Sequence, residues 1–280
     1  SLLIRYAGVN TALLFVATLG LALIWVTWLY LREPQGTTHL RLKGISRTLW
    51  NLIKKKQNLL LTAYSGLAFA PLAVFGGLWG TPFLQATDHL STTAAAGLVS
   101  LSYVGFGIGG PLFGYLSDRH AKRTGFMVTG LIISALFLSA VVFVHFDSTI
   151  YLAMALLCFG MGTGSFMLGF TMGKEINETH LAGSVISMIN TGDAFMGAIT
   201  EPLIGKWLDW GWKGKRFHGA RVFSVNDYHH AFTLLLGYLL LALVIVCFIH
   251  RNERKRDQPN HDSKDYQSNS PSPAHHSITA

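Results

Sequence analysis

Two carboxylates, Asp193 and Glu201, stand within a stretch of the chain that is otherwise apolar. A charge in hydrocarbon is costly, so an acid in such a stretch normally faces a water-filled cavity or a polar partner. A carboxylate in a cavity can bind and release a proton, which is the chemistry of proton-coupled transport. The alternative is that each acid only hydrogen-bonds a neighbouring helix and holds the bundle together. The sequence leaves both interpretations open.

A second group of ionisable residues lies in a short connection between two apolar runs. It contains Gly114, then an apolar residue two positions on, then Asp118-Arg119, and then the basic pair Lys122-Arg123. Because charge is excluded from hydrocarbon, this connection must lie at the water interface. A basic loop is ordinary at such a place, but this order of residues is more specific than a basic composition alone.

The elements that position these residues are seven apolar runs, each close to the roughly 20 residues that a membrane-crossing helix needs. Half of the 280 residues are hydrophobic and 13% are charged, about half the charged fraction of a typical soluble domain. The sequence therefore predicts an all-α, polytopic membrane protein. The predicted spans are Val9–Leu31, Leu59–Leu84, Ala94–Leu116, Gly125–Val144, Ile150–Gly173, Gly183–Leu208 and Ala231–Ile249.

The segment Leu40–Gln57 differs from the spans. Its apolar residues fall on one helical face with basic residues around them, which is the pattern of an amphipathic helix on an anionic membrane surface. A solvated linker is the alternative interpretation. The apolar face consists of Leu42, Ile45, Leu49, Leu52 and Ile53.

Glycines in the third span recur at the four-residue spacing that lets helices pack closely in lipid. The pairs are Gly105/Gly109 and Gly110/Gly114. The string GFGIGG in this span faintly resembles a dinucleotide-binding loop, but no strand precedes it and it lies inside an apolar run.

Several classes of function are excluded by composition. The net charge of +8 comes from loops and the tail, so membrane topology explains it better than a nucleic-acid partner. Cys158 and Cys247 lie in apolar runs and suit packing rather than a disulfide framework, and the twelve histidines form no metal-ligand pattern. No nucleophile–base arrangement or phosphate-cradling loop is present, so we expect neither an enzyme nor a bound cofactor or metal.

The distribution of basic residues predicts the orientation in the membrane. Sixteen of the 22 lysines and arginines fall in the linker, the Asp118 loop, the Lys174 loop and the tail, which alternate onto one side. The positive-inside rule makes that side cytoplasmic. We expect a multi-pass protein of the plasma (bacterial inner) membrane with a cytoplasmic C-terminus. The polar tail, residues 251–280, has a composition typical of disorder.

The Asp118 loop resembles the signature loop G-x-L-x-D-R-x-x-[KR]-[KR] of the major facilitator superfamily, with Ala121 where that family often has Gly. The segment MGAITEPLIGKWLD, residues 196–209, resembles that family's eleventh helix. One span, a basic linker and six spans are similar to helices 6 to 12 of the family's twelve-helix plan.

The resemblance implies a division of the chain. Residues 1–31 would be the last transmembrane helix of an N-terminal half, and residues 32–57 a basic cytoplasmic linker that is amphipathic or solvated. Residues 58–250 would form the C-terminal six-helix bundle. Five helices of the plan are absent from this sequence. Because residue 1 is Ser and no signal peptide is seen, we interpret the start as a cut inside a longer protein.

The resemblance also implies roles for the signature residues. In this family two halves rock around a site at the membrane midplane, and the loop acts as a cytoplasmic latch. Asp118 would face a helix N-terminus in the missing N-terminal half, where an anion is favoured. Arg119, Lys122 and Arg123 would orient that acid and grip lipid phosphate, and Gly114 would permit close approach.

The order of spans implies which residues face the cavity. Spans two and five correspond to cavity-lining helices, and their polar and aromatic groups suit a small polar solute. Packing or lipid contact is the alternative for Trp79 and Phe166. A polar stripe on span six adds Asn190. The cavity candidates are Tyr64, Trp79, Gln85, Thr163, Ser165, Phe166 and Asn190.

The leading hypothesis is a secondary active transporter that moves a small polar nutrient or metabolite by alternating access, coupled to protons at Asp193 or Glu201. The competing hypothesis is a truncated, non-transporting membrane protein or a half-transporter that needs a partner half. A permease subunit driven by a separate ATPase is a third option, and the Asp118 loop argues against it.

Overall fold

The structure is a computed structural model that describes residues 2–30, 45–217 and 220–257. Half of the predicted linker, residues 32–44, and most of the predicted tail, residues 258–280, lie outside the described residues.

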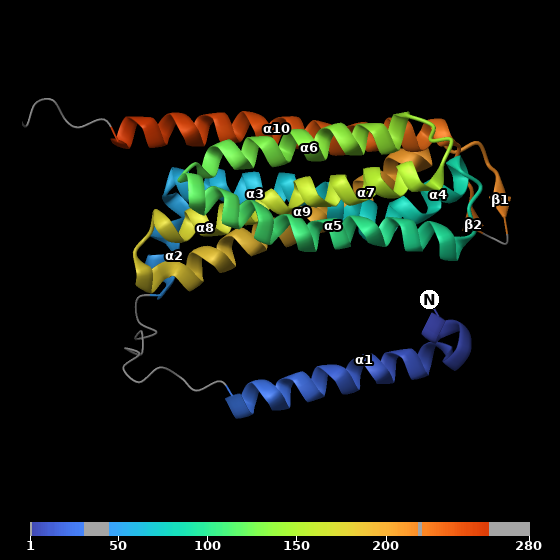
Figure 1. Ribbon diagram of the computed structural model, residues 1–280, viewed down its shortest axis with the longest axis horizontal. Helices are drawn as coiled ribbons and strands as arrows, with labels where there is room; N and C mark the ends of the chain where they lie inside the picture. The colour runs from blue at the N-terminus through green and yellow to red at the C-terminus, as the bar shows by residue number, and fades with distance from the viewer. Residues whose placement is uncertain (1, 31–44, 218–219, 258–280) are drawn as a thin grey trace, which may run out of the picture.

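Helices make up nearly all of the described chain, and the predicted all-α multi-pass fold is confirmed (Figure 1). A two-stranded hairpin near one end is the exception, and the sequence did not predict it. The elements are α1 (Leu2–Tyr30), α2 (Ile45–Lys54), α3 (Lys56–Val74), the π-helix η1 (Phe75–Trp79), α4 (Gly80–Thr87), α5 (Thr92–His120), α6 (Arg123–Phe143), α7 (Thr149–Thr163), the 3₁₀ helix η2 (Gly164–Met167), α8 (Leu168–Glu175), the 3₁₀ helix η3 (Thr179–Leu181), α9 (Ala182–Gly211), β1 (Arg216–Phe217), β2 (Ala220–Arg221) and α10 (Val225–Asp257).

Six stretches of the described chain are long and apolar enough to cross a membrane. They correspond to six of the seven predicted spans. The remaining predicted span, Gly183–Leu208, lies in α9, which has the necessary length at 30 residues but does not belong to that apolar group. The polar stripe of α9 and its acids account for the difference.

Two of the predicted spans are built from three consecutive helical pieces. Span two consists of α3, η1 and α4, and span five consists of α7, η2 and α8. Irregular turns within a membrane helix free backbone groups that neighbouring elements must satisfy, and they often occur at functional sites. Both interruptions lie in the spans that the resemblance assigned to the cavity.

The closest helix packing depends on glycine. A Cβ atom at Gly105 would collide with the backbone of Leu157 on α7, and one at Gly109 would collide with the backbone of Met161. The predicted packing role of this pair is confirmed. In the second predicted pair only Gly110 packs closely: a Cβ atom at Gly164 of η2 would collide with the Gly110 amide nitrogen, whereas Gly114 has nothing described within 4 Å.

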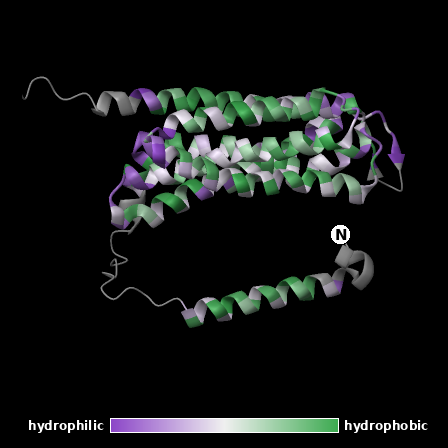
Figure 2. Ribbon diagram, in the orientation of Figure 1, coloured by the Kyte–Doolittle hydropathy of each residue, from purple (hydrophilic) through white to green (hydrophobic). Residues whose placement is uncertain are grey.

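The two ends of the bundle differ in composition. Helix α2, the end of α8 and the C-terminal end of α10 lie at one end, and the β1–β2 hairpin lies at the other (Figure 1). Hydrophilic residues concentrate at both ends, with apolar helix between them (Figure 2). Helix α1 is drawn apart from the bundle, and all but one of its side chains whose burial is described are exposed.

The segment predicted as either an amphipathic helix or a solvated linker contains the described helix α2. One boundary differs from the sequence prediction. Helix α10 continues to Asp257, so residues 251–257 of the predicted disordered tail are helical. This part of the chain is rich in arginine, lysine and glutamate, which favour helix, and the helix ends two residues before Pro259, which disfavours it.

Candidate functional site

Asp193 on α9 is buried, with 5% of its surface exposed. Its Oδ1 atom has no hydrogen-bond partner among the described residues. The hydroxyl of Ser65 on α3 interacts with this carboxyl group but does not reach good hydrogen-bond geometry. A buried polar atom without a partner is unusual in a folded protein and needs an explanation such as a bound water, ion or catalytic role.

Close backbone contact between α3 and α9 is what buries this acid. A Cβ atom at Gly66 on α3 would lie 2.9 Å from the carbonyl oxygen of Gly192, the residue next to Asp193. The Thr62 side chain already occupies the space where a side chain at position 192 would be. Small residues at this crossing therefore let the two helices approach and place the acid between them.

Further unpaired hydroxyls lie on the elements around Asp193. The Tyr64 hydroxyl donates a hydrogen bond to the Ser165 carbonyl oxygen at 3.1 Å and lies close enough to Asp193 to feel its charge. The side-chain oxygens of Thr62, Ser65 and Ser165 are buried without partners in the described chain. Together with Asp193, these side chains form a buried polar group on α3, η2 and α9, in which several oxygen atoms have no hydrogen-bond partner among the described residues. We call it the Asp193 cluster, and its members are Thr62, Tyr64, Ser65, Ser165 and Asp193. It brings together three predicted site residues: Tyr64, Ser165 and Asp193.

An aromatic wall adjoins this cluster. Phe166 stacks on Phe69 with ring centroids 4.8 Å apart, and Phe106 and Phe170 each lie 5.7 Å from Phe166. Phe166 is buried, while the other three rings are partly exposed. Phe166 thus makes packing contacts, and its role as a cavity lining stays a prediction.

Glu201 lies on a different face of α9 from Asp193. It is partly exposed, and its charge acts on the Tyr103 hydroxyl of α5. Asn190 is exposed on the surface of α9. These two residues therefore face outward from the bundle, whereas Asp193 faces α3.

The remaining predicted cavity residues lie away from the Asp193 cluster. The Trp79 ring, on η1, lies against α9 at Gly205, 3.3 Å from where a Cβ atom at that glycine would be. The Gln85 amide donates to the Thr92 hydroxyl at 2.9 Å, near the hairpin end of the bundle. Thr163 and Ser134 share a hydrogen bond of 3.0 Å between α7 and α6.

Arg123 organises the signature loop. Its guanidinium pairs with Asp118, donates to the Ser117 hydroxyl at 2.6 Å, and donates to Glu175 Oε1 at 2.7 Å. Asp118 and Glu175 come from the ends of α5 and α8, so one arginine ties two loops together. The planar guanidinium suits this task because its donors form a rigid fork.

Ala121 ends α5 in a left-handed conformation, with φ 50° and ψ 36°. Glycine adopts this conformation without penalty, whereas a side chain crowds the following carbonyl. The position thus explains in physical terms why glycine is common there in sequences with this loop.

A network of amides lies beside the arginine. The Asn58 and Asn177 side chains exchange hydrogen bonds of 2.8 Å and 3.3 Å, and the Lys55 ammonium donates to the Ile176 carbonyl oxygen at 2.6 Å. Asn58 is fully buried. The end of α8 is therefore attached both to the signature loop and to the start of α3.

The family model of the Major Facilitator Superfamily matches residues 1–201 and 81–277. The chain belongs to this superfamily. The inward-open structure of the xylose transporter XylE from E. coli has a TM-score of 0.55 and 15% sequence identity to this facilitator chain. The match covers 79% of this chain and 55% of XylE, so the chain spans little more than half of that transporter. No curated protein matches the chain.

The superfamily's signature loop was found from sequence, but its internal arrangement was not. Arg119 makes only a long contact with the Tyr115 hydroxyl at 3.4 Å, and Lys122 is exposed, while Arg123 forms the ion pairs. Glu175, the second acid of this network, is not among the predicted site residues. The basic-acidic pair Lys174-Glu175 at a helix end was the available signal, but pairing across 52 residues cannot be read from spacing.

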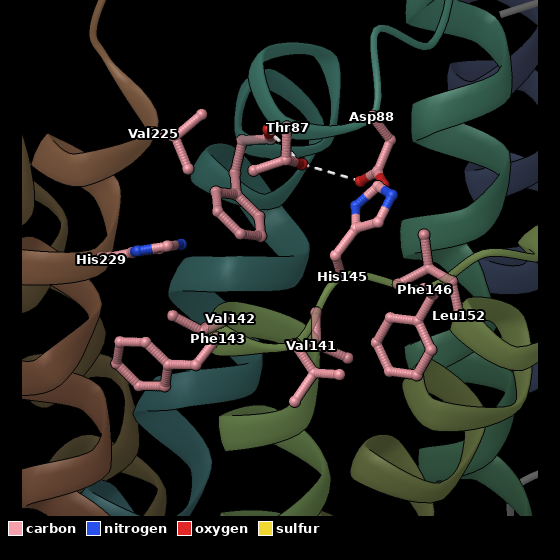
Figure 3. Close-up of a pocket in the computed structure, with 12 residues that line it drawn as sticks. Thr87, Asp88, Val141, Val142, Phe143, His145, Phe146, Leu152, Val225 and His229 are labelled. Atoms are coloured by element: carbon pink, nitrogen blue, oxygen red, sulfur yellow. Dashed lines mark hydrogen bonds between the residues drawn. The ribbon is translucent and has the colours of Figure 1, made fainter.

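A small hollow of about 160 Å³ lies at the hairpin end of the facilitator bundle (Figure 3). Its walls are mostly apolar, with Asp88 and His145 on one side and His229 across from them. The Thr87 hydroxyl donates to Asp88 at 2.7 Å. The described residues contain no group of three or more His, Cys, Asp or Glu placed to hold a metal ion. The hollow shares no residue with the Asp193 cluster.

Proposed function

We propose that this chain is part of a secondary active transporter that moves a small polar nutrient or metabolite by alternating access, with proton coupling at Asp193. The observation that carries the proposal is the buried carboxyl group of Asp193, whose Oδ1 atom has no partner in the described bundle. A carboxyl group in this position can take up a proton on one side of the membrane and release it on the other.

The surroundings of Asp193 support this role. It lies between α3 and α9, so a change in its charge alters the contact between two helices that pack through Gly66 and Gly192. The interruption η2 contributes Ser165 to the same cluster, as irregular helices do at transporter binding sites. Glu201, partly exposed beside Tyr103, is the second proton-coupling candidate.

The proposal includes the rest of the transporter. Helix α1 would belong to an N-terminal half of the same protein, and bundle α3 to α10 would be the C-terminal half. The substrate would bind between the halves against Phe69, Phe106 and the exposed polar stripe of α9. The end of the bundle with α2 and the signature loop would face the cytoplasm, and the C-terminus with it, in the plasma membrane.

Within this scheme the signature loop is a latch. Asp118 is 65% exposed despite its pairing with Arg123, so it remains able to meet a helix N-terminus of the other half. Arg123 and Glu175 hold the acid in position while Gly114 leaves open space beside it.

The test is proton flux in proteoliposomes that contain the full-length gene product and a pH-sensitive dye in the lumen. A panel of sugars, sugar acids and amino acids is added outside, and pentoses are included because the structural relative XylE is described as a xylose transporter. A transported solute should carry protons inward. The Asp193→Asn variant should lose substrate-driven proton movement, because an amide does not titrate.

Asp88→Asn is the matched control, since it removes an equivalent carboxyl group at the hairpin end and should keep the coupled flux. Glu201→Gln tests the second candidate in the same assay. Solute uptake that ignores the pH gradient in the wild type would overturn proton coupling, and intact coupled flux in Asp193→Asn would overturn the role of this residue.

A further inference from the structure

Four basic residues cluster in the connection between α9 and α10, at the end of the bundle opposite the signature loop. They are Lys213, Lys215, Arg216 and Arg221. In a multi-pass protein the loops on one side carry most of the basic residues, and the sequence predicts that sixteen of 22 fall on the side of the signature loop. Such a concentration on the side that should be poor in bases needs its own physical explanation.

The hairpin places two of these charges directly against each other. Strands β1 and β2 are antiparallel, and Arg216 is the register partner of Arg221. Like charges opposite each other on paired strands are destabilising. Both guanidinium groups lie over the Trp212 ring, at 5.5 Å and 4.9 Å from its centroid. The Trp212 indole is itself fixed by a 2.8 Å hydrogen bond to the Lys215 carbonyl oxygen.

The acids around the hairpin do not balance these cations. Asp209 pairs with Arg221. Lys213, Lys215 and Arg216 are exposed and form no ion pair with an acid in the described part of the chain. Three positive charges therefore lie on or beside the hairpin without an ion pair to any acid among the described residues.

The preceding turns of α9 indicate the depth of this hairpin in the membrane. Trp207 and Trp210 are exposed near the end of α9, with ring centroids 6.3 Å apart. Tryptophan side chains concentrate at the level of lipid headgroups. The hairpin follows them directly and projects from the end of the bundle, where Figure 2 shows a hydrophilic tip beside apolar helices.

We propose that Lys213, Lys215, Arg216 and Arg221, arranged around Trp212, form a binding site for the phosphate groups of anionic phospholipids in the leaflet at this end of the bundle. The phosphates supply the counter-charge that the hairpin lacks, and arginine and lysine around Trp212 bind them from the headgroup side. A basic residue close to an anionic membrane surface contributes about 1 kcal/mol, which corresponds to roughly fivefold in affinity. This site is separate from the transport site and does not depend on proton coupling.

The experiment compares retention of phosphatidylglycerol by native mass spectrometry, using full-length protein from nanodiscs of phosphatidylcholine with and without phosphatidylglycerol. The double variant Lys213→Gln/Lys215→Gln should retain phosphatidylglycerol roughly 25-fold less well at this site. Lys213→Arg/Lys215→Arg keeps both charges and should match the wild type. Because anionic lipid also meets the bases at the other end, the measured quantity is the difference between variant and wild type.

A second arm adds inorganic phosphate at the same charge concentration to phosphatidylcholine nanodiscs. The proposal expects that inorganic phosphate alone does not stabilise the protein. If phosphate stabilises the protein as much as phosphatidylglycerol does, the site binds a soluble anion instead and the proposal is wrong. Equal lipid retention by wild type and Gln variant overturns the proposal. If the Gln double variant does not fold, Arg216→Gln gives the same comparison with a single charge.

Discussion

Replacing Gly105 by alanine should destabilise the bundle, whereas the same change two residues later should not. The Cβ atom at position 105 would overlap the Leu157 carbonyl oxygen and lie 2.9 Å from its carbonyl carbon and 3.0 Å from the Met161 amide nitrogen. Gly107, on the same helix, has nothing described within 4 Å of the equivalent position. The two substitutions thus share the helix and the chemistry, and differ only in what the methyl group meets.

The expected magnitude follows from these contacts. Non-bonded heavy atoms settle at about 3.5–4 Å, so α7 must retreat from α5 by roughly 1 Å. The atoms that it would meet belong to the backbone, which cannot rotate away. Overpacking of this kind costs about 1–3 kcal/mol, and the better helix propensity of alanine returns up to about 1 kcal/mol. Gly107→Ala has only the second contribution.

The assay is thermal unfolding of purified protein in detergent, followed by the loss of helical circular dichroism. A change of 1 kcal/mol shifts the midpoint by about 2–4 °C in a protein of this size. Gly105→Ala should melt several degrees below the wild type, and Gly107→Ala at or slightly above it. Equal midpoints for the two variants would refute the claim that α5 and α7 touch through their backbones.

Two further predictions concern the signature loop. Ala121→Gly should raise the unfolding midpoint by about 2–4 °C, because it removes roughly 1 kcal/mol of left-handed strain, while Ala96→Gly within α5 should lower it. Arg123→Gln should cost about 0.5–2 kcal/mol in denaturant unfolding, because it removes two solvent-exposed ion pairs worth up to about 1 kcal/mol each, and Arg119→Gln should cost less than about 0.5 kcal/mol. Similar losses for the two arginine variants would contradict the assignment of Arg123 as the organising cation.

The membrane spans could be predicted from sequence because apolar length is a local property. The form of the interruptions inside them could not. Residues 59–84 are apolar with helix breakers at Gly76-Gly77, Gly80 and Pro82, but these do not specify that Phe75–Trp79 takes the wider π-helical turn. A Cβ at Gly164 would collide with the backbone of Gly109 and Gly110, so the 3₁₀ turn at η2 lies directly against α5. Such contacts join residues more than fifty positions apart, and spacing along the chain carries no trace of them.

The signature loop shows the same limit. The order of residues from Gly114 to Arg123 identified the loop, because a motif is written in consecutive positions. It treated Arg119, Lys122 and Arg123 as equivalent cations. The structure distinguishes them because α6 begins at Arg123, which points this side chain back toward α5 and α8, while Lys122 remains exposed. Direction comes from the turn at Ala121, which the sequence marks only by an alanine in place of the usual glycine.

The two acids of α9 lie in one apolar stretch of the sequence but have different surroundings in the structure. Asp193 and Glu201 are eight residues apart, which at about 100° per residue separates their directions by roughly 80°. Asp193 therefore turns toward α3, where Gly66 and Gly192 bring the backbones together, and Glu201 turns toward Tyr103 at the edge of the bundle. In the proposed mechanism, protonation of Asp193 would change a helix contact within the bundle, whereas protonation of Glu201 would change the face that the bundle presents to its surroundings. A carboxyl group of the first kind would alter the shape of the bundle itself, which is the physical reason to propose the coupling step at Asp193.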